Sequence, residues 1–303
     1  MKIALIGPGA MGLLFGGYLS KHHDVTLIGR NPAVMEVINQ NGLTILETNG
    51  TENRYTPKAC TAGGTDTADL VILFTKAGAS RQALEENRAL IGKDTFLMTL
   101  QNGAGHEELL QEFASPEQII IGTTQQGSYK LDTTSICHSG GGETYFGAIT
   151  GDSSRFEHIA EAFRKCGFPA HTAAQVKGMI WNKLMINASS SVLSGILQTA
   201  QGFVAEDPHA WDIAQKLIRE LCAVATADGY PFDEEGQIIR LQEHLRKAPS
   251  GYTSIYADLK AGRKTEVDVI SGFVAATGHR LGVPVPTHEM MVALVHAMEN
   301  RGK

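Results

Sequence analysis

Strand-like and helical patterns alternate along the first half of the chain. Apolar-rich runs of strand length lie at 2–6, 24–28, 43–48, 54–60, 69–74, 95–100 and 118–124. Helical patterns separate several of them, at 9–21, 33–41, 78–91 and 106–113. The run at 69–74, DLVILF, is almost wholly apolar, which is typical of a strand covered on both faces. Strands that alternate with helices predict an α/β domain with a parallel, doubly wound sheet.

The pattern changes twice in the later part of the chain. Residues 128–147 are rich in Thr, Ser and Gly and predict antiparallel strands joined by turns, with a helix following near 153–165. After about residue 174 the plausible elements are all helices, at 176–200, 207–228, 234–247, 253–261, 266–281 and 287–300. We therefore predict an α/β domain over 1–174 and an all-helical domain over 175–303.

Composition supports two domains and excludes some classes of partner. A chain of 303 residues exceeds one ordinary core, and 43% hydrophobic with 19% charged residues is typical of a soluble globular protein. The net charge of −6 gives no general attraction to nucleic acid or to anionic membranes. No window approaches the roughly 18–20 apolar residues of a membrane span. We expect neither a nucleic-acid partner nor a membrane partner.

The cysteines and the N-terminus indicate a cytoplasmic protein. The four cysteines are far apart and form no C-x-x-C pair, which is typical of reduced thiols: Cys60, Cys137, Cys166 and Cys222. The apolar run at the N-terminus is short and broken by glycines, unlike a signal peptide. The histidines show no ligand spacing with cysteines or carboxylates, so we predict no metal site. The oligomeric state is not determined by the sequence, and a homodimer is left open.

The motif GPGAMG at 7–12 fits the G-x-G-x-x-G pattern of a dinucleotide-binding loop. Alone the pattern is weak, and it could be a structural turn, but here it follows a strand and begins a helix. Gly7 permits the tight turn, Gly9 lets a pyrophosphate approach the backbone, and Gly12 lets the helix pack closely. The N–H groups at the helix start would face the phosphates. The predicted cofactor-binding residues of the loop are Gly7, Pro8, Gly9, Ala10, Met11 and Gly12.

The residue after the second strand favours NADP(H). An NAD site usually has Asp or Glu there, to hold the ribose 2′-hydroxyl. This chain has Arg30 at that place, flanked by Gly29 and Asn31. A guanidinium can pair with a 2′-phosphate through two charge-assisted hydrogen bonds. The alternative is a solvated surface arginine.

Two other strand ends carry polar residues. Ligands of open α/β sheets lie beyond the carboxyl ends of the strands. Thr75 and Lys76 follow one predicted strand, and Gln101 and Asn102 follow the next. We expect Asn102 near the nicotinamide, and Lys76 at the cofactor. Asn-Gly is also a common turn pair, and Lys76 could be a surface lysine at a helix start.

The segment IWNKLMINASSS at 180–191 places a lysine on an otherwise apolar helix. Lys183, Asn187 and Ser191 are four residues apart, so a continuous helix would align them as a polar stripe. From these residues alone a catalytic lysine and a structural lysine, either snorkelling or paired with a carboxylate, are equally supported.

Five segments together resemble the ketopantoate reductase (2-dehydropantoate 2-reductase) family. They are GPGAMG at 7–12, FTKAG at 74–78, LQNGAG at 100–105, IWNKLMINASSS at 180–191 and GRKTEVDVISGF at 262–273. The last two are the specific part, since many dehydrogenases share the others. The resemblance implies a Rossmann-type domain followed by a helical domain. It also implies NADPH-dependent reduction of ketopantoate to pantoate, a step of pantothenate and hence coenzyme A biosynthesis.

The resemblance also implies roles for single residues. Lys183 would be the general acid, and Asn187 would contact the substrate. Asn102 would lie between cofactor and substrate, and Glu266 would help to bind the cofactor and organise the site. Hydride arriving at a ketone carbon places negative charge on its oxygen, which a lysine tuned toward neutrality by burial can stabilise.

The substrate side departs from the family pattern. Ser254 in GYTSIYADL would match the substrate-binding serine, with Asp258 as its nearby acid. Ser191, which we expect at the substrate, stands where a second asparagine is common, and Gln201 stands near another such position. Residues 125–128 (QQGS) also differ.

These departures leave open which 2-keto acid is reduced. One alternative is a reductase of another 2-keto acid or an imine on the same scaffold. A further alternative is a non-catalytic NADP(H)-sensing protein, which would not need Lys183 and Glu266 together.

Overall fold

The computed structural model describes residues 1–62 and 66–301. Its chain forms two compact units. The first, the nucleotide unit, comprises Met1–Gln101 and His106–Val176. The second, the helical unit, comprises Asn102–Gly105 and the chain from Lys177 onward. A four-residue turn from the first half of the sequence therefore belongs to the helical unit.

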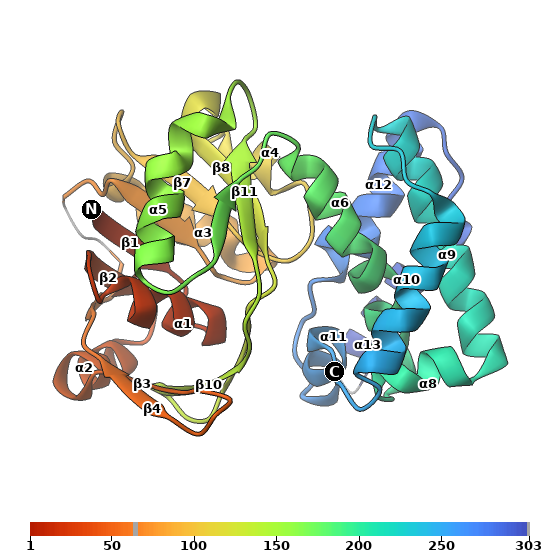
Figure 1. Cartoon of the computed structure of the whole chain (residues 1–303), viewed down its shortest axis with the longest axis horizontal. Helices are drawn as coiled ribbons and strands as arrows, with labels where there is room; N and C mark the ends of the chain where they lie inside the picture. Colours follow the sequence, from red (N-terminus) through yellow and green to blue (C-terminus); the bar gives the residue numbers. More distant parts are fainter. Residues whose placement is uncertain (63–65, 302–303) are drawn as a thin grey trace. The chain divides into compact units, whose positions relative to one another are not determined.

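An eight-stranded sheet in the order β12-β11-β8-β7-β6-β1-β2-β5 forms the centre of the nucleotide unit (Figure 1). Only the β8–β11 pair is antiparallel within this sheet. The chain runs outward from β1 in both directions, which confirms the predicted doubly wound α/β fold. The strands are β1 (Lys2–Ile6), β2 (Asp24–Ile28), β5 (Lys58–Cys60), β6 (Leu70–Leu73), β7 (Phe96–Thr99), β8 (Ile119–Thr124), β11 (Thr144–Ala148) and β12 (Ala170–Thr172).

A second sheet has four strands in the order β4-β3-β10-β9. It differs from the sequence prediction in two respects. Its strands are β3 (Leu43–Leu46), β4 (Glu52–Tyr55), β9 (Gly127–Lys130) and β10 (Ser135–Gly140). The single strand expected at 54–60 is wrong, because β4 ends before Pro57, which has no N–H for a ladder, and β5 joins the other sheet. The segment 128–147 does form strands, but β9 and β10 join this sheet while β11 joins the large one.

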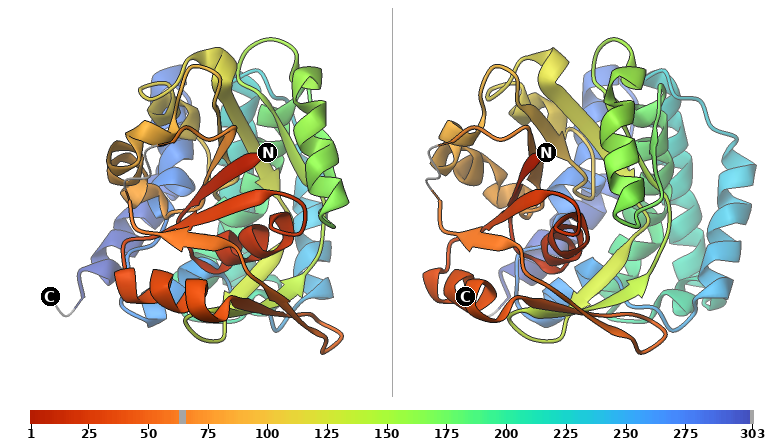
Figure 2. Two further views of the ribbon diagram at one scale, coloured as in Figure 1. Left: turned by 90° about the vertical axis from the view of Figure 1, so that its left-hand side faces the viewer. Right: turned by 60° about the vertical axis from the view of Figure 1, so that its left-hand side comes forward.

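Five α-helices in the described part of the nucleotide unit pack around these sheets. They are α1 (Ala10–Leu19), α2 (Pro32–Asn41), α3 (Ser80–Glu86), α4 (His106–Leu110) and α5 (Glu157–Lys165). Helix α1 contacts strands of both sheets, and its Phe15 stacks on Phe168 with ring centroids 4.2 Å apart. Helix α2 and the β3–β4 hairpin lie at one end of the unit (Figure 2). Helix α3 is shorter than the expected 78–91, with single 3-10 turns before and after it.

The helical unit is built around the 20-residue helix α9 (Pro208–Ala227). Asp207 caps this helix by accepting hydrogen bonds from the N–H groups of His209 and Ala210, and Pro208 follows as its first residue. The other helices are α6 (Val176–Ile186), α7 (Val192–Leu197), α8 (Gln201–Glu206), α10 (Glu234–Lys247), α11 (Ser254–Lys260), α12 (Ser271–Leu281) and α13 (Pro286–Glu299). No helix in the described ranges is long and apolar enough to cross a membrane.

Two long helices expected in this unit are interrupted. The helix expected at 176–200 is broken by a π-helical turn, Asn187–Ser191, between α6 and α7. The helix expected at 266–281 begins as a 3-10 turn, Val267–Val269, before α12. Both interruptions fall beside residues that the sequence marks as functional, Lys183 and Glu266.

Candidate active site

In the glycine loop, packing requires glycine at two positions, Gly7 and Gly12, whereas Gly9 leaves space for a ligand. Gly7 has a φ of +104°, and a Cβ there would lie 2.6 Å from the Thr75 nitrogen. A Cβ at Gly12 would lie 2.1 Å from the Gly7 carbonyl oxygen. Both positions therefore require glycine for internal reasons. At Gly9, apart from its chain neighbours, no heavy atom of the described residues lies within 4 Å of the Cβ position, so space beside that backbone remains for a ligand's phosphate.

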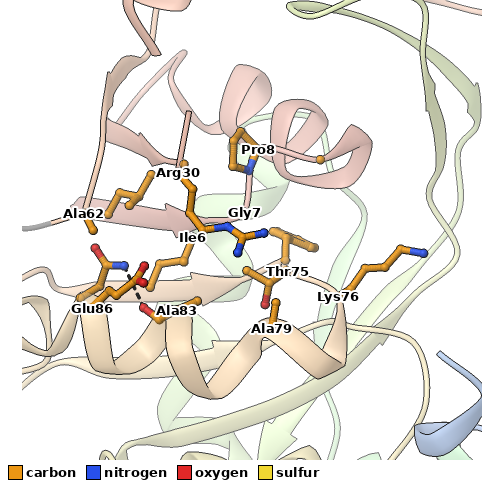
Figure 3. A pocket seen from close by; sticks show the side chains of 15 residues that line it. Ile6, Gly7, Pro8, Arg30, Ala62, Thr75, Lys76, Ala79, Ala83 and Glu86 are labelled. Atoms are coloured by element: carbon orange, nitrogen blue, oxygen red, sulfur yellow. Dashed lines mark hydrogen bonds between the residues drawn. The ribbon is translucent and has the colours of Figure 1, made fainter. Parts of the chain in front are cut away.

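A cavity of about 410 Å³ adjoins the loop within the nucleotide unit. Its lining includes Gly7, Pro8 and Gly9 of the loop, together with Arg30 and Lys76. Arg30 extends toward Gly7 and Thr75, whereas the Lys76 side chain extends away from the other labelled side chains (Figure 3). The remaining loop residues, Ala10, Met11 and Gly12, form the first turn of α1. The structure thus brings Arg30 and the start of the loop together around one cavity.

The residue next to Arg30 has a structural task. The Asn31 carboxamide oxygen caps α2, accepting from the N–H groups of Ala33 at 3.1 Å and Val34 at 3.4 Å. Arg30 itself is exposed. Arg30 is therefore the charged residue after β2 that an anionic ligand in the cavity can contact.

The ends of β6 and β7 are linked by Gln101, which is buried. Its Nε2 donates to the Thr75 carbonyl oxygen and, at 3.0 Å, to Ser80 Oγ. Its Oε1 accepts from Thr99 Oγ1 at 2.8 Å. This network fixes the backbone that lines the cavity at Thr75 and Lys76. The sequence identified the strand end but not this bracing role.

In the helical unit, Lys183 lies on the last turn of α6, half-buried. Burial lowers the pKa of Lys183 from 10.5 to about 8, and the negative charge of Glu266 offsets part of this decrease. The ammonium of Lys183 is therefore a stronger acid than that of a free lysine, as the sequence argument requires.

The π turn Asn187–Ser191 alters the predicted polar stripe. Ser189 Oγ donates to the Met185 carbonyl oxygen, and Ser190 Oγ donates to the Ile186 carbonyl oxygen at 3.2 Å. Such serine bonds compete with the regular helix ladder. The turn therefore replaces part of the continuous helix that the four-residue spacing assumed, and Ser191 at its end is buried.

Two helix starts pack against this π turn. Thr253 Oγ1 donates to the Ser191 carbonyl oxygen at 3.2 Å and also caps α11 by accepting from the Tyr256 N–H. Ser271, the first residue of α12, donates to the Ala188 carbonyl oxygen at 3.4 Å. The first of these contacts places Ser254, exposed at the start of α11, beside the turn.

Asp258, the expected acid near Ser254, has a structural partner. Its side chain is 8% exposed and accepts from Arg263 Nε at 3.0 Å. The Arg263 N–H also donates to the Asp258 carbonyl oxygen at 2.8 Å. This residue therefore ties the end of α11 to the segment that leads to Glu266.

Glu266 lies in a turn that Glu299 holds in place. The buried Glu299 carboxylate accepts from Lys264 Nζ at 2.8 Å and from the Thr265 N–H at 2.7 Å and Oγ1 at 2.8 Å. Thr265 Oγ1 in turn accepts from the Val267 N–H at 3.2 Å. Glu266 is thereby fixed between two anchored residues. No sequence signal singled out Glu299, which stands at the end of an ordinary amphipathic helix.

The turn that carries Asn102 packs against the residues after Glu266. The Ala104 N–H donates to the Val269 carbonyl oxygen at 2.9 Å, and a Cβ at Gly103 would lie 2.4 Å from that oxygen. Asn102, Lys183 and Glu266 are thus all part of the helical unit, although Asn102 follows a strand of the large sheet.

Comparisons with known proteins extend over the whole chain. Residues 3–151 match the family model described as "Ketopantoate reductase PanE/ApbA", and residues 175–299 match "Ketopantoate reductase PanE/ApbA C terminal". The 2-dehydropantoate 2-reductase of Pyrococcus horikoshii is 30% identical over 305 residues, covering 100% of this chain and 99% of that protein. The chain belongs to the ketopantoate reductase family.

Two solved structures of other proteins are similar to this chain over nearly their full lengths. The ternary structure of D-mandelate dehydrogenase with NADH and anilino(oxo)acetate has a TM-score of 0.93 at 28% identity, covering 99% of both chains. The 2-dehydropantoate 2-reductase from Geobacter metallireducens GS-15 has a TM-score of 0.89 at 27% identity, covering 98% of this chain and 99% of that one. The protein is an oxidoreductase of this family, and the predicted nicotinamide dinucleotide cofactor is confirmed.

Proposed function

We propose that the protein reduces 2-dehydropantoate to pantoate with NADPH, in pantothenate and coenzyme A biosynthesis. The observation that carries the proposal is Lys183, a half-buried lysine whose pKa lies near 8, with the Glu266 carboxylate acting on it electrostatically. A protein that only sensed NADP(H) would have no use for an acid tuned to neutral pH. The cavity beside Gly9 and Arg30 supplies the cofactor site that the reaction needs.

Lys183 acts as the general acid in this reaction. When bound, NADPH supplies the hydride that reduces the keto carbon. The ammonium of Lys183 stabilises the negative charge that develops on the keto oxygen and donates the proton to it. Glu266 favours the charged form of the lysine, so that most of the enzyme carries the proton at neutral pH. Asn187, Ser191 and Ser254 bind the substrate without adding charge.

The preference for NADPH over NADH rests on Arg30. It follows β2, where an NAD site usually has a carboxylate, and it extends into the cavity beside the loop. The loop 7–12, Arg30 and Lys76 bind the cofactor in this proposal, and the family resemblance assigns Asn102 and Glu266 to its binding as well. Asn102 also contacts the substrate.

One observation favours a second candidate, a reductase of 2-keto acids that carry an aromatic group. The similarity to D-mandelate dehydrogenase, with a TM-score of 0.93, accompanies the departures at Ser191 and Gln201. Absorbance assays of NADPH and NADH oxidation with ketopantoate and with phenylglyoxylate separate the two candidates. A kcat/KM higher for phenylglyoxylate than for ketopantoate would replace the first candidate with the second.

The general-acid role is tested with Lys183→Met, which keeps length and removes the charge. Lys216→Met is the matched control, because Lys216 is exposed on α9 and pairs with Asp212 across the helix surface at 2.7 Å. We expect the first variant to lose activity and the second to keep it. Retention of near-normal kcat by a folded Lys183→Met enzyme would leave the lysine a structural role only.

We infer a cytoplasmic location from the four free cysteines, which are widely spaced in the sequence, as is typical of reduced thiols. A homodimer stays a prediction, which light scattering of the purified protein checks.

A further inference from the structure

Phe273 packs against two segments of the helical unit that carry proposed site residues. It lies half-buried in the first turn of α12. A Cβ built at Gly105 would lie 2.9 Å from its Cδ2 and 3.1 Å from its Cε2, so the ring leaves no room for a side chain there. The ring also lies beside Trp181 of α6, with ring centroids 5.2 Å apart. One side chain therefore contacts both the turn of Asn102 and the helix of Lys183.

Trp181 is fixed against α12 at two points. It is 3% exposed, and its Nε1 donates to Asp228 Oδ2 at 3.2 Å. The other carboxylate oxygen of Asp228 accepts from Arg280 Nη2 at 3.0 Å. Arg280 follows Phe273 on α12 by about two helical turns, so both side chains lie on one face of that helix. The ring contact and the Asp228 carboxylate therefore join α6 to this face, close to Lys183.

Two kinds of contact hold the turn Asn102–Gly105. One is a backbone hydrogen bond, from the Ala104 N–H to the Val269 carbonyl oxygen at 2.9 Å. The other is the packing of the Phe273 ring against the backbone at Gly105, whose φ of +80° also favours glycine. A single hydrogen bond leaves a turn free to tilt about it, whereas a flat ring under the backbone opposes that tilt. A smaller side chain at 273 would therefore let the turn shift while its hydrogen bond remained.

We propose that Phe273 is a positioning residue for the reduction: its ring holds the turn of Asn102 at a set place relative to α6 and Lys183. The proposal rests on the functions proposed above for Asn102 and Lys183, which belong to the same unit. A group that orients substrate and cofactor must keep its geometry relative to the general acid, and a displacement of about 1 Å can cost about 100-fold in rate. Phe273 acts through Asn102 and touches neither substrate nor cofactor.

The test is a double-mutant cycle on kcat/KM, measured by NADPH absorbance with the better of ketopantoate and phenylglyoxylate. Phe273→Leu keeps the position apolar and removes the flat ring, and we expect a loss of about 10–100-fold, mostly in kcat. Asn102→Ala should also reduce kcat/KM. The double variant should lose little more than the weaker of the two single variants, because Phe273 acts through Asn102. The control Phe232→Leu, half-buried against the same core, should keep its activity.

Losses that multiply in the double variant would overturn the proposal, because the two residues would then act independently. A folded Phe273→Leu enzyme with wild-type kcat/KM would overturn it as well. If circular dichroism shows that this variant is unfolded, Phe273→Met takes its place, because methionine fills the space without a flat ring. Wild-type activity in Asn102→Ala would instead reject the proposed function of Asn102 itself, so the two failures are distinct.

Discussion

Changing Lys183 to methionine should alter both the activity and the pH dependence of stability. The pKa of this lysine falls from 10.5 to about 8 on burial. At about 1.36 kcal/mol for each pKa unit, holding the charged form in the folded protein costs about 3 kcal/mol. Because the folded-state pKa lies below the unfolded one, this cost is present in full below about pH 8 and disappears as the pH rises toward 10.5.

The activity assay follows from the same pKa. A general acid must be protonated, so kcat/KM should be level below about pH 8 and fall about tenfold for each further pH unit. Lys183→Met should reduce kcat by about 10²–10⁴-fold while leaving the binding of NADPH nearly unchanged. NADPH binding is measured by fluorescence titration, and kcat by absorbance at saturating substrate.

The stability assay is urea unfolding of the wild type and Lys183→Met between neutral pH and about pH 10. The wild type should gain stability relative to the variant across that range. A kcat/KM that stays level up to pH 10, together with parallel stability profiles, would refute the reasoning, because the lysine would then titrate like an exposed one.

Other residues give simpler tests. Arg30→Ala should weaken NADPH by about 1.5–3 kcal/mol, with NADH little affected; equal losses in titrations of both cofactors would show that Arg30 does not contact the 2′-phosphate. Glu266→Gln should move the fall in kcat/KM to lower pH, because the carboxylate raises the pKa of Lys183. Burial raises the pKa of Glu299, but bonds from Lys264, Thr265 and His296 outweigh this and lower it from 4.5 to about 2. Glu299→Gln should therefore reduce the free energy of unfolding at neutral pH by up to about 3 kcal/mol. The difference from the wild type should shrink as the pH falls from about 4.5 toward 2, and an unchanged difference in urea unfolding at low pH would contradict this.

The large sheet was predictable because its strands are buried on both faces. Runs such as Leu70–Leu73 are short and apolar throughout, which is typical of a strand buried on both faces. The small sheet was harder to predict. Its strand β10 pairs with β3, some 90 residues earlier in the chain, and such a partner leaves no local signal. The three-residue strand β12 was not predicted either, because its pairing with β11 leaves no local signal in the sequence.

The candidate site was predictable where chemistry requires a residue type, and not where packing sets the geometry. The glycine loop, Arg30 and Lys183 stand out by type and place. The π turn depends on Ser189 and Ser190 bonding to carbonyl oxygens, which serines on a regular helix can do without breaking it.

The π turn also has a consequence for insertions and deletions. A helix that contains one wide turn holds an extra residue relative to a regular helix spanning the same two ends. Deleting one residue from Asn187–Ser191 would therefore restore the regular ladder and leave α6 and α7 in place. Lys183 and the buried Val192 and Leu193 would keep their positions, and the change would be confined to the turn. A variant shortened by one serine should therefore fold with Lys183 unmoved, so that a loss of activity in it would report on the turn itself.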